Sequence, residues 1–511
     1  MYHSSCLLLS SALHSKRQLS CRRAQDLPLL KKFIEMCTFL ASVFKAETIP
    51  HSSPEIPAWA SNFWAAQQAS VTPFCIFQPR NAKEVVVVVL VSRKLGCSFA
   101  VKSGGHAAFA GASNVDGGIT IDLARLDAIE ITDDKKIAKV GAGNTWYRVY
   151  TSLEADQLAV IGGRVADIGV GGFTLGGGIS FFSGSHGWGC DNVANYELVT
   201  AAGSILQVNQ KFYPDLYWAL RGGGSNVGVV TRFDLETFPQ GSIWGGSRVY
   251  NATTYGSDLI KAFVDFGNNP DEHAATWLSF VKFQGATVMS ILLMHATPAP
   301  NPPVFNAYKA IPSLTDTTKI RTLADLTLET NASNPKGRRQ SYWMHTFKFN
   351  VQLIEFMTET YLEEVVPVES VSGLEYPLVL QFITKETLVK MQRNGGNATP
   401  LPKNADDGPF LIMQLCPMWL AQQDDEAVIG SIVGILDKVV GRAKETGMYR
   451  DADQEADMNY GSDYQDVLGS YGEDNYERLE KIAKRHDPMG VFQTLNKGYF
   501  KFGGPPKGSS T

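Results

Sequence analysis

The pattern of apolar and polar positions predicts alternating helices and strands over the first half of the chain. Residues 83–96 follow Pro79 and stop at Gly96, which is the flanking typical of a helix, even for this valine-rich run. Short apolar runs that end in glycine or in a polar turn predict strands. We expect these strands at residues 98–105, 119–123 and 137–143, with a polar turn at 133–136 before the last of them.

The next segments extend this alternation to about residue 240. Residues 144–160 have the apolar spacing of a helix, with Asn144 as its N-cap. Residues 196–209 predict a hairpin, and residues 229–239 predict a strand that closes the region.

Beyond residue 241 the periodic segments become longer. They predict helices at 255–267, 426–445 and 475–488, strands at 287–297 and 408–420, and a proline-rich surface loop at 296–304. At 511 residues the chain is long enough for two domains, or for one domain with a large insertion.

Charge and composition exclude some partners. The net charge is −5, and no cluster of lysine and arginine marks a nucleic-acid surface. No apolar run is long enough to cross a bilayer. We therefore expect neither a nucleic-acid partner nor a membrane span.

The cysteines have no spacing that suits zinc, so no metal site is expected. Cys75 and Cys97 flank a predicted strand–helix–strand unit. They either pair in an oxidising compartment or remain two buried free thiols.

The N-terminal 49 residues leave the localisation open. A short apolar run without preceding positive residues is followed by a basic stretch, and no acid occurs before Asp26. This composition is closer to a transit peptide than to a signal peptide. Sequons at Asn251, Asn331 and Asn397 favour a secretory route instead, where they would accept glycans. Residues 1–49 are thus either a targeting segment or disordered.

Three glycine-dense segments, at 102–106, 169–180 and 221–230, carry the functional signal. Glycine permits positive φ and lets backbone N–H groups approach an anion. Three such loops predict a long phosphate-bearing ligand. The segments fit neither the G-x-G-x-x-G dinucleotide fingerprint nor a Walker loop, which excludes a Rossmann domain.

Four separated motifs carry a family resemblance: FAVKSGGH (99–106), GVGGFTLGGGISFFSGSHGWGCDNV (169–193), LYWALRGGGSNVGVVTRF (216–233) and YGEDNYERLEKIAKRHDPMGVFQTLNKG (471–498). Together they resemble the FAD-binding PCMH-type oxidoreductases, in particular the berberine-bridge-enzyme-like branch with its fungal oligosaccharide oxidases and secondary-metabolism enzymes. The resemblance covers roughly residues 58–500.

The resemblance implies an α+β fold with a two-subdomain PCMH-type FAD-binding domain and an antiparallel-sheet substrate domain. The implied division is an FAD domain at 50–240, a substrate domain at 241–455, a C-terminal segment at 456–502 that returns to the FAD domain, and a flexible tail at 503–511.

The resemblance also implies the cofactor. In this family the histidine after Gly-Gly is commonly bonded to the 8α-methyl group of the flavin, so FAD is expected to be held by one covalent bond to His106. The alternative is non-covalent FAD beside a loop histidine. Many members add a second bond from a cysteine, but Val165 stands at that position and excludes it.

Carried over position by position, the cofactor-binding set comes from all three glycine segments and the C-terminal motif. Ile168 would lie near the flavin edge where oxygen approaches. The set is Lys102, Ser103, Gly104, Gly105, His106, Ile168, Gly169, Gly171, Gly172, Gly176, Gly177, Gly178, Val230 and Asn496.

The catalytic base departs from the family pattern. Oxidation of an alcohol or amine needs a base while hydride passes to the flavin. Fungal members often use the tyrosine of a Tyr-x-Asn pattern; here Asp457 takes its place, and Asn459 and Tyr460 are retained. Asp457 is the base if burial raises its pKa, Tyr460 replaces it, or the base is lost. Otherwise Asp457 is a solvated carboxylate in an acidic loop.

The resemblance therefore implies an FAD-linked oxidoreductase that oxidises a small organic molecule of fungal secondary metabolism. It is either an oxidase with O2 as the electron acceptor or a dehydrogenase, because Ile168 leaves efficient use of O2 open. Two alternatives stay open. One is a flavoprotein that catalyses cyclisation or rearrangement without net redox change, and the other is a secreted carbohydrate oxidase.

Overall fold

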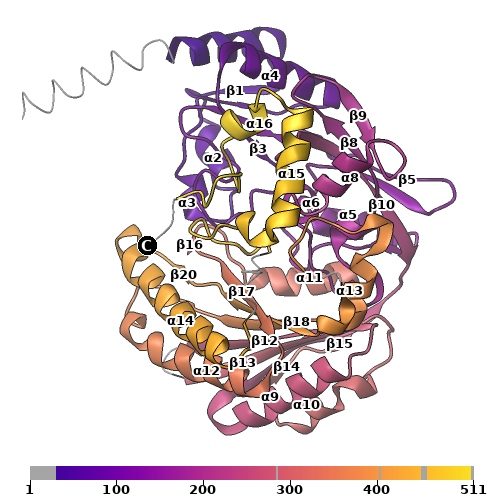
Figure 1. The fold of residues 1–511 in the computed structure, drawn as a ribbon, viewed down its shortest axis with the longest axis vertical. Coiled ribbons are helices and arrows are strands. Elements are labelled where there is room, and N and C mark those ends of the chain that lie inside the picture. The colour runs from indigo at the N-terminus through magenta and orange to yellow at the C-terminus, as the bar shows by residue number, and fades with distance from the viewer. Residues whose placement is uncertain (1–29, 284–285, 402–403, 450–456, 508–511) are drawn as a thin grey trace, which may run out of the picture.

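Three large β-sheets form the frame of the part of the protein that the structure describes (Figure 1). The structure is a computed structural model, and it describes residues 30–283, 286–401, 404–449 and 457–507. Helices and antiparallel sheets are combined in one chain, which confirms the predicted α+β fold class. None of the described helices has both the length and the apolar character needed to cross a membrane.

The first sheet has the strand order β1-β2-β4-β3, with β2, β4 and β3 parallel and β1 antiparallel. Helix α4 (Ala82–Leu95) connects β2 to β3 and confirms the predicted helix. It begins where the Asn81 side chain accepts the Glu84 N–H at 3.2 Å, and it ends at Gly96, whose φ is +67°. The strands are β1 (Thr48–Pro50), β2 (Cys75–Phe77), β3 (Phe99–Lys102) and β4 (Ile119–Asp122).

Residues 30–49 pack into this layer, although the sequence placed them in a separate N-terminal segment. Residues 30–43 form a helix, and β1 pairs with β2. A disulfide joins Cys37 of this helix to Cys75 of β2. Both expectations for Cys75 were therefore wrong, because its partner is Cys37. Cys97 is a free buried thiol, as one of the two alternatives had it. The pairing could not be read from spacing, since helix and strand meet only in the fold.

The second sheet is antiparallel and surrounds the long strand β10 (Val229–Pro239). Its hairpin of β8 and β9 confirms the prediction for residues 196–209. The other strands are β5 (Ile129–Ile131), β6 (Ile137–Gly141), β7 (Leu158–Val160), β8 (Val193–Val199) and β9 (Ile205–Val208).

The helix predicted over 144–160 is shorter in the structure and has another N-cap. Helix α5 spans Trp146–Glu154, and residues 158–160 form strand β7, which pairs with β10. Asn144 is buried, and its amide donates to the Gly141 carbonyl at 3.0 Å, so it does not cap the helix. Pairing with β10 overrides the local helical spacing.

The third sheet is antiparallel, and both of its faces are apolar. Successive side chains alternate between the faces: Ile412 packs in the core shared with the first two sheets, while its neighbours Leu411 and Met413 pack in a second core. Helices α9 (Ala252–Asn268), α12 (Val351–Glu364) and α14 (Asp425–Glu445) cover the second face (Figure 1). The main strands are β11 (Ile243–Asn251), β12 (Ala274–Phe283), β13 (Ala286–His295), β17 (Trp343–Lys348), β18 (Leu378–Ile383) and β19 (Phe410–Leu415).

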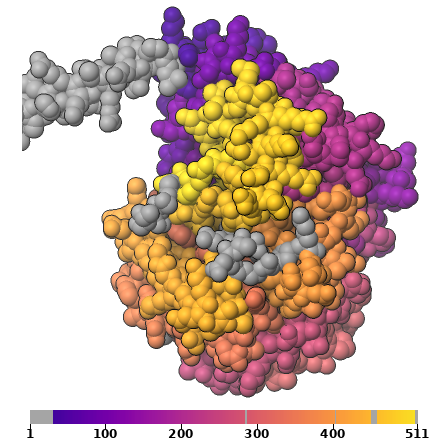
Figure 2. All heavy atoms as spheres, in the orientation of Figure 1, coloured from indigo at the N-terminus to yellow at the C-terminus, as the bar shows by residue number. Residues whose placement is uncertain are grey.

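The C-terminal residues return to the N-terminal half of the protein. Helices α15 (Glu473–His486) and α16 (Val491–Thr494) lie over the first two sheets, and the space-filling view shows them on one face of that half (Figures 1 and 2). Phe99 of β3 donates its N–H to the Leu495 carbonyl at 2.8 Å. This return brings the C-terminal motif next to the strand that leads into the first glycine loop.

Candidate functional site

The first two glycine loops touch each other at the level of their backbones. A Cβ on Gly104 would lie 2.5 Å from the Gly169 nitrogen, and a Cβ on Gly169 would lie 2.2 Å from the Gly104 nitrogen. Ser103 ties the loops together, because its Oγ accepts the Gly171 N–H at 3.1 Å and donates to the Ala142 carbonyl at 2.6 Å. Only glycine permits this approach, so the two loops form one cradle.

Lys102 stands at the entrance of the first loop and is held by a buried carboxylate. Its Nζ lies 3.3 Å from Asp122 Oδ1 and donates to the Ser103 carbonyl at 3.3 Å. Trp59 and Gln78 donate to the other oxygen of Asp122 at 2.8 and 2.9 Å. Lys102 thus fixes the start of the loop, and its predicted contact with a phosphate stays a prediction.

His106 follows the loop and lies against an aromatic ring. Its imidazole stacks on Trp64 with 4.3 Å between ring centroids and 10° between ring planes. The turn requires glycine at position 105, because its φ is +73° and a Cβ there would collide with the Phe63 ring. Burial lowers the pKa of His106 to about 4, so the ring is neutral at physiological pH.

The cradle fits the flavin cofactor that the resemblance implies. Nε2 of His106 is buried and has no hydrogen-bond partner among the described residues. Within the same part of the chain, the backbone N–H groups of Gly104, Gly105 and His106 donate to no other residue. Backbone N–H groups of this kind suit phosphate oxygens, and a neutral imidazole suits a covalent link to an electron-poor ring. Val165 provides no second link, since it carries no thiol.

The glycines at the end of the second loop have a packing role in the structure. A Cβ on Gly176 would meet the Asn459 amide at 2.3 Å, and one on Gly177 would meet the Trp188 ring at 2.7 Å. A Cβ on Gly178 would lie 2.5 Å from the Phe173 ring. These three glycines therefore permit close packing in the structure. Their predicted contact with the cofactor stays a prediction.

The third glycine loop closes over helix α6 (Val170–Leu175). The N–H groups of Gly222 and Gly224 both donate to the Leu175 carbonyl, at 3.1 and 3.0 Å. Asn496 reaches this loop from the C-terminal segment, and its amide lies 3.3 Å from Ser225 Oγ. Loop 221–228 therefore links the C-terminal motif to the second glycine loop.

Two further predicted cofactor residues lie in the framework of the site. Val230 is buried in β10 opposite Leu198, and Ile168 is half-buried, with its carbonyl accepting the Trp146 N–H at 3.0 Å. Neither position tests the predicted contact with the flavin.

The three catalytic candidates form one tight turn. The Asn459 N–H donates to Asp457 Oδ1 at 2.8 Å, and the Tyr460 N–H donates to the Asp457 carbonyl at 2.9 Å. The Asn459 amide also donates to the Phe173 carbonyl at 3.1 Å, which fixes the turn against α6.

Asp457 is buried, which sets aside the alternative of a solvated carboxylate. Its side chain is 4% exposed, and Oδ2 has no hydrogen-bond partner among the described residues. Burial raises the pKa of Asp457 from 3.8 to about 7, while the Asn459 N–H and the positive charge of Arg164 act in the opposite direction. A carboxyl group that titrates near neutrality can take up and release a proton.

Arg164 is a functional candidate that sequence reasoning missed. Its Nη2 donates to Tyr460 O–H at 2.8 Å and to Gln381 Oε1 at 2.6 Å, and its guanidinium lies 4.5 Å from the centre of the Trp277 ring. Among the described residues it forms no ion pair with a carboxylate. No local sequence signal could have found it, because its partners lie in β12, β18 and the C-terminal segment.

A series of ring contacts connects His106 with the catalytic turn. Trp64, which stacks on His106, is 5.1 Å from the ring of Tyr342, and Tyr342 is 6.1 Å from the ring of Tyr460. The structure therefore brings the first glycine loop and the Asp457–Tyr460 turn to one site.

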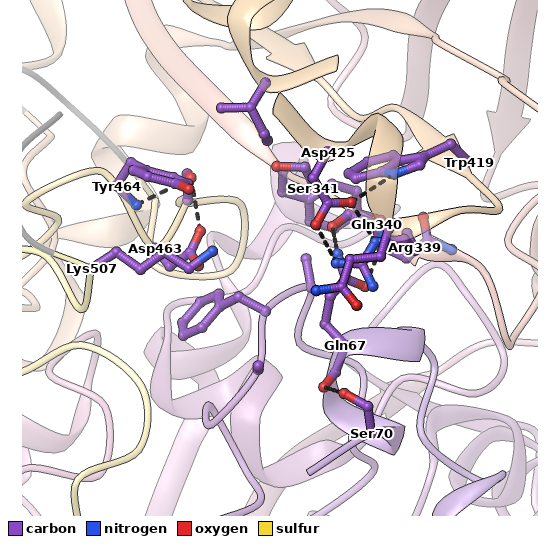
Figure 3. A pocket seen from close by; sticks show the side chains of 17 residues that line it. Gln67, Ser70, Arg339, Gln340, Ser341, Trp419, Asp425, Asp463, Tyr464 and Lys507 are labelled. Carbon is purple, nitrogen blue, oxygen red and sulfur yellow. Dashed lines mark hydrogen bonds and ion pairs between the residues drawn. The ribbon is translucent and has the colours of Figure 1, made fainter. Parts of the chain in front are cut away.

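A cavity of about 260 Å³ opens beside Tyr342 (Figure 3). On one side of it Arg339 contacts Asp425, which also accepts the Trp419 indole N–H at 2.9 Å. On the other side Lys507 lies 2.8 Å from Asp463. The cavity also reaches residues 108–110, which begin two positions after His106. It thus joins the N-terminal half, the two-stranded sheet of β16 (Arg339–Gln340) and β20 (Met418–Trp419), the start of α14, and the C-terminal segment.

No group of three or more His, Cys, Asp or Glu side chains within the described part of the chain could hold a metal ion.

Comparison with known proteins agrees with this geometry. Residues 73–209 match the model of the FAD binding domain family. The chain is 37% identical over 456 residues to FAD-dependent monooxygenase FUP4 of Fusarium proliferatum, covering 86% of this chain and 87% of the relative. It is 38% identical over 457 residues to FAD-dependent monooxygenase tpcD of Cochliobolus heterostrophus, with the same coverage.

Solved structures share the fold. One neighbour is 6-hydroxy-D-nicotine oxidase from Arthrobacter nicotinovorans, with a TM-score of 0.76, 19% identity, and coverage of 88% of this chain and 97% of that one. Another is berberine bridge enzyme from Eschscholzia californica, with a TM-score of 0.73, 18% identity, and coverage of 90% and 97%. At such low identity the likeness shows the fold alone.

Proposed function

Because the chain belongs to the FAD-binding PCMH-type oxidoreductases and is an FAD-dependent enzyme, we propose that it oxidises a small organic molecule of secondary metabolism by hydride transfer to the flavin. The observation that carries the reaction is the buried carboxyl group of Asp457, whose pKa lies near neutrality and which stands in one site with the glycine cradle. The fungal relatives over most of the chain support this class of enzyme.

The chain's own residues would hold FAD in the following way. The backbone of residues 103–106 and 169–172 would receive the diphosphate, and a ring nitrogen of His106 would form the single covalent bond to the flavin. When bound, the flavin accepts the hydride that substrate oxidation releases.

Asp457 is proposed as the base that takes the proton from a substrate hydroxyl or amine. When the pKa of a base lies near the working pH, a large fraction of the carboxyl group is ionised, and the carboxylate is still basic enough to take the substrate proton. The Asn459 N–H holds Oδ1, which leaves Oδ2 for the substrate proton. Arg164 favours the ionised carboxylate through its charge.

Tyr460 is proposed to position the substrate beside Asp457. Its oxygen accepts a hydrogen bond from Arg164 Nη2, so its own proton is free to be donated to a substrate oxygen. The contact with Gln381 fixes Arg164 in turn.

The cofactor proposal is tested by acid precipitation of the purified protein. We expect the yellow colour to stay in the pellet of the wild type and to move to the supernatant for His106→Ala. Yellow in the wild-type supernatant would show non-covalent FAD, and a colourless protein in both fractions would contradict FAD binding.

The reaction proposal is tested by anaerobic mixing with candidate alcohols and amines, with flavin absorbance as the readout. For Asp457→Asn we expect a loss of about 10²- to 10⁴-fold in the rate of flavin bleaching, the usual contribution of a general base. Asp474→Asn, at an exposed position in α15, should leave the rate unchanged. Equal rates for wild type and Asp457→Asn would remove Asp457 from the mechanism.

Oxygen insertion is a second candidate, and it is favoured because the fungal relatives are named FAD-dependent monooxygenases. Reaction under labelled oxygen separates the two, because an oxidase leaves the label in hydrogen peroxide and a monooxygenase places one atom in the product. Conversion of substrate without flavin bleaching or oxygen uptake would instead support rearrangement without net redox change.

A further inference from the structure

Two features outside the candidate active site indicate the compartment in which the chain folds. One is the buried disulfide, and the other is the difference in exposure and hydrogen bonding among the three sequons. In the sequence alone, the sequons favoured a secretory route and the pairing of the cysteines stayed open.

The disulfide lies inside the first core. Cys37 is 8% exposed and Cys75 is fully buried, and the helix that carries Cys37 also buries Phe33, Met36 and Leu40 in this core. Structural disulfides form and persist in oxidising compartments, of which the secretory pathway is the main eukaryotic one. A cytosolic chain would keep these two cysteines as thiols.

The sequon at Asn397 is held by hydrogen bonds within the folded protein. The Asn397 amide nitrogen, the atom that would carry a glycan, donates to Asp191 Oδ1 at 2.7 Å. Thr399 of the same sequon is 3% exposed, and its Oγ1 donates to Asn397 Oδ1 at 2.6 Å. A glycan at this position is incompatible with the folded protein.

The sequon at Asn331 faces the candidate active site. Asn331 is half-buried in α11 (Leu323–Ala332), and its Oδ1 accepts the Asp167 N–H at 3.2 Å. Asp167 lies two residues before the second glycine loop. Because Asn331 is half-buried against this part of the chain, a glycan on its nitrogen has less room there than on an exposed asparagine.

The sequon at Asn251 is open. Asn251 is exposed at the start of α9, and its Oδ1 accepts the Thr254 N–H at 3.1 Å. Its amide nitrogen donates to none of the described residues, and Thr253 is exposed as well. A glycan on this nitrogen leaves the N-cap bond intact, because that bond uses the oxygen.

We infer that the chain passes through a secretory pathway and carries one N-linked glycan, on Asn251, with its Cys37–Cys75 bond formed. The folded structure selects this sequon from the three, since Asn251 is exposed whereas Asn331 and Asn397 are half-buried. The disulfide supports the route independently of the sequons.

The test uses the full chain produced in a yeast or filamentous-fungal host and digested with an N-glycosidase. We expect one shift to higher mobility, and we expect Asn251 to be converted to Asp in the peptide mass spectrum. Without reduction, a peptide pair linked through Cys37 and Cys75 should be found. An undigested mass equal to the bare chain, or alkylation of both cysteines without prior reduction, would overturn the inference.

Matched variants assign the site. Thr253→Ala removes the acceptor but leaves the Asn251 cap, so it should abolish the shift, whereas Thr253→Ser keeps the acceptor and should keep the shift. Asn251→Asp also retains a capping oxygen and should migrate like the digested wild type. A shift that persists in Thr253→Ala would contradict Asn251 as the glycan site.

Discussion

At the scale of single residues, burial decides what the ionisable groups of the site can do. His106 and Asp457 have opposite charge types, yet desolvation drives both toward their neutral forms: it lowers the pKa of the imidazole to about 4 and raises the pKa of the carboxyl group to about 7. The neutral imidazole suits a covalent link, and the carboxyl group near neutrality suits proton transfer. Desolvation thus favours both the covalent link at His106 and proton transfer at Asp457.

Arg164 should control the pH at which Asp457 works. Its positive charge favours the carboxylate, so Arg164→Met should raise the pKa of Asp457 further. Because the base must be ionised, the rate of flavin bleaching rises with pH through that pKa. We expect the midpoint of this rise to move up by about 1 pH unit, measured in anaerobic stopped-flow experiments.

A surface arginine provides the control for this shift. Arg148 is half exposed and pairs with Asp127, so Arg148→Met should leave the midpoint where it is in the wild type. A midpoint that stays constant or falls in Arg164→Met would show that Arg164 does not act on Asp457 through its charge.

At the scale of elements, the close contact of two loops makes the cofactor cradle. Residues 103–106 end a parallel strand, and residues 169–172 start helix α6 after a different sheet. The contact therefore joins the first and second sheets at one point. Ser103 of the first loop strengthens this contact, because its side chain bonds to Gly171 of the second loop and to Ala142, directly after β6.

Gly104→Ala should separate these loops. The added Cβ would lie 2.5 Å from the Gly169 backbone nitrogen, so the backbone itself must move. We expect a loss of about 1–3 kcal/mol in the free energy of unfolding of the flavin-free protein, measured with denaturant, and a lower flavin content.

Gly172 gives a matched control on the same cradle. A Cβ there meets no atom within 4 Å, and the position is exposed in α6, so Gly172→Ala should keep or slightly raise the stability of the flavin-free protein. Equal stability for Gly104→Ala and wild type would refute the tight contact between the loops.

At the scale of the whole molecule, segments distant in sequence complete one site. After β10 the chain builds the third sheet, which packs one face on the first core and the other on a core of its own, and it then returns to the first core with residues 457–507. Arg164, Gln381 and Tyr460 meet only because of this return. The N-terminal helix is fastened to the same half through the Cys37–Cys75 disulfide.

Reduction of this disulfide should destabilise the protein. The bond closes a loop with a sequence separation of 38, and removal of such a crosslink usually costs about 2–4 kcal/mol. We expect a reductant to lower the thermal midpoint of the wild type. Cys37→Ala should have the lower midpoint without reductant and should not respond to it further. A wild type that is insensitive to reductant after complete reduction would contradict a stabilising role.

The sequence by itself determined the fold class, most of the periodic elements and the family. Helix α4, the hairpin β8–β9 and strand β10 follow from local periodicity and from punctuation by glycine and proline, which act within a few residues. The four motifs predicted FAD through resemblance, because a glycine loop and its histidine are contiguous in the chain.

Only the tertiary structure decided the contacts between segments. The burial of Asp457, the bonds of Arg164, the partner of Cys75 and the accessibility of Asn251 depend on which segments meet in space. The change from the predicted helix end at 158–160 to strand β7 has the same origin, since pairing with β10 outweighs local propensity. Desolvation and disulfide pairing are properties of a packed environment, and no spacing within a single stretch of sequence encodes that environment.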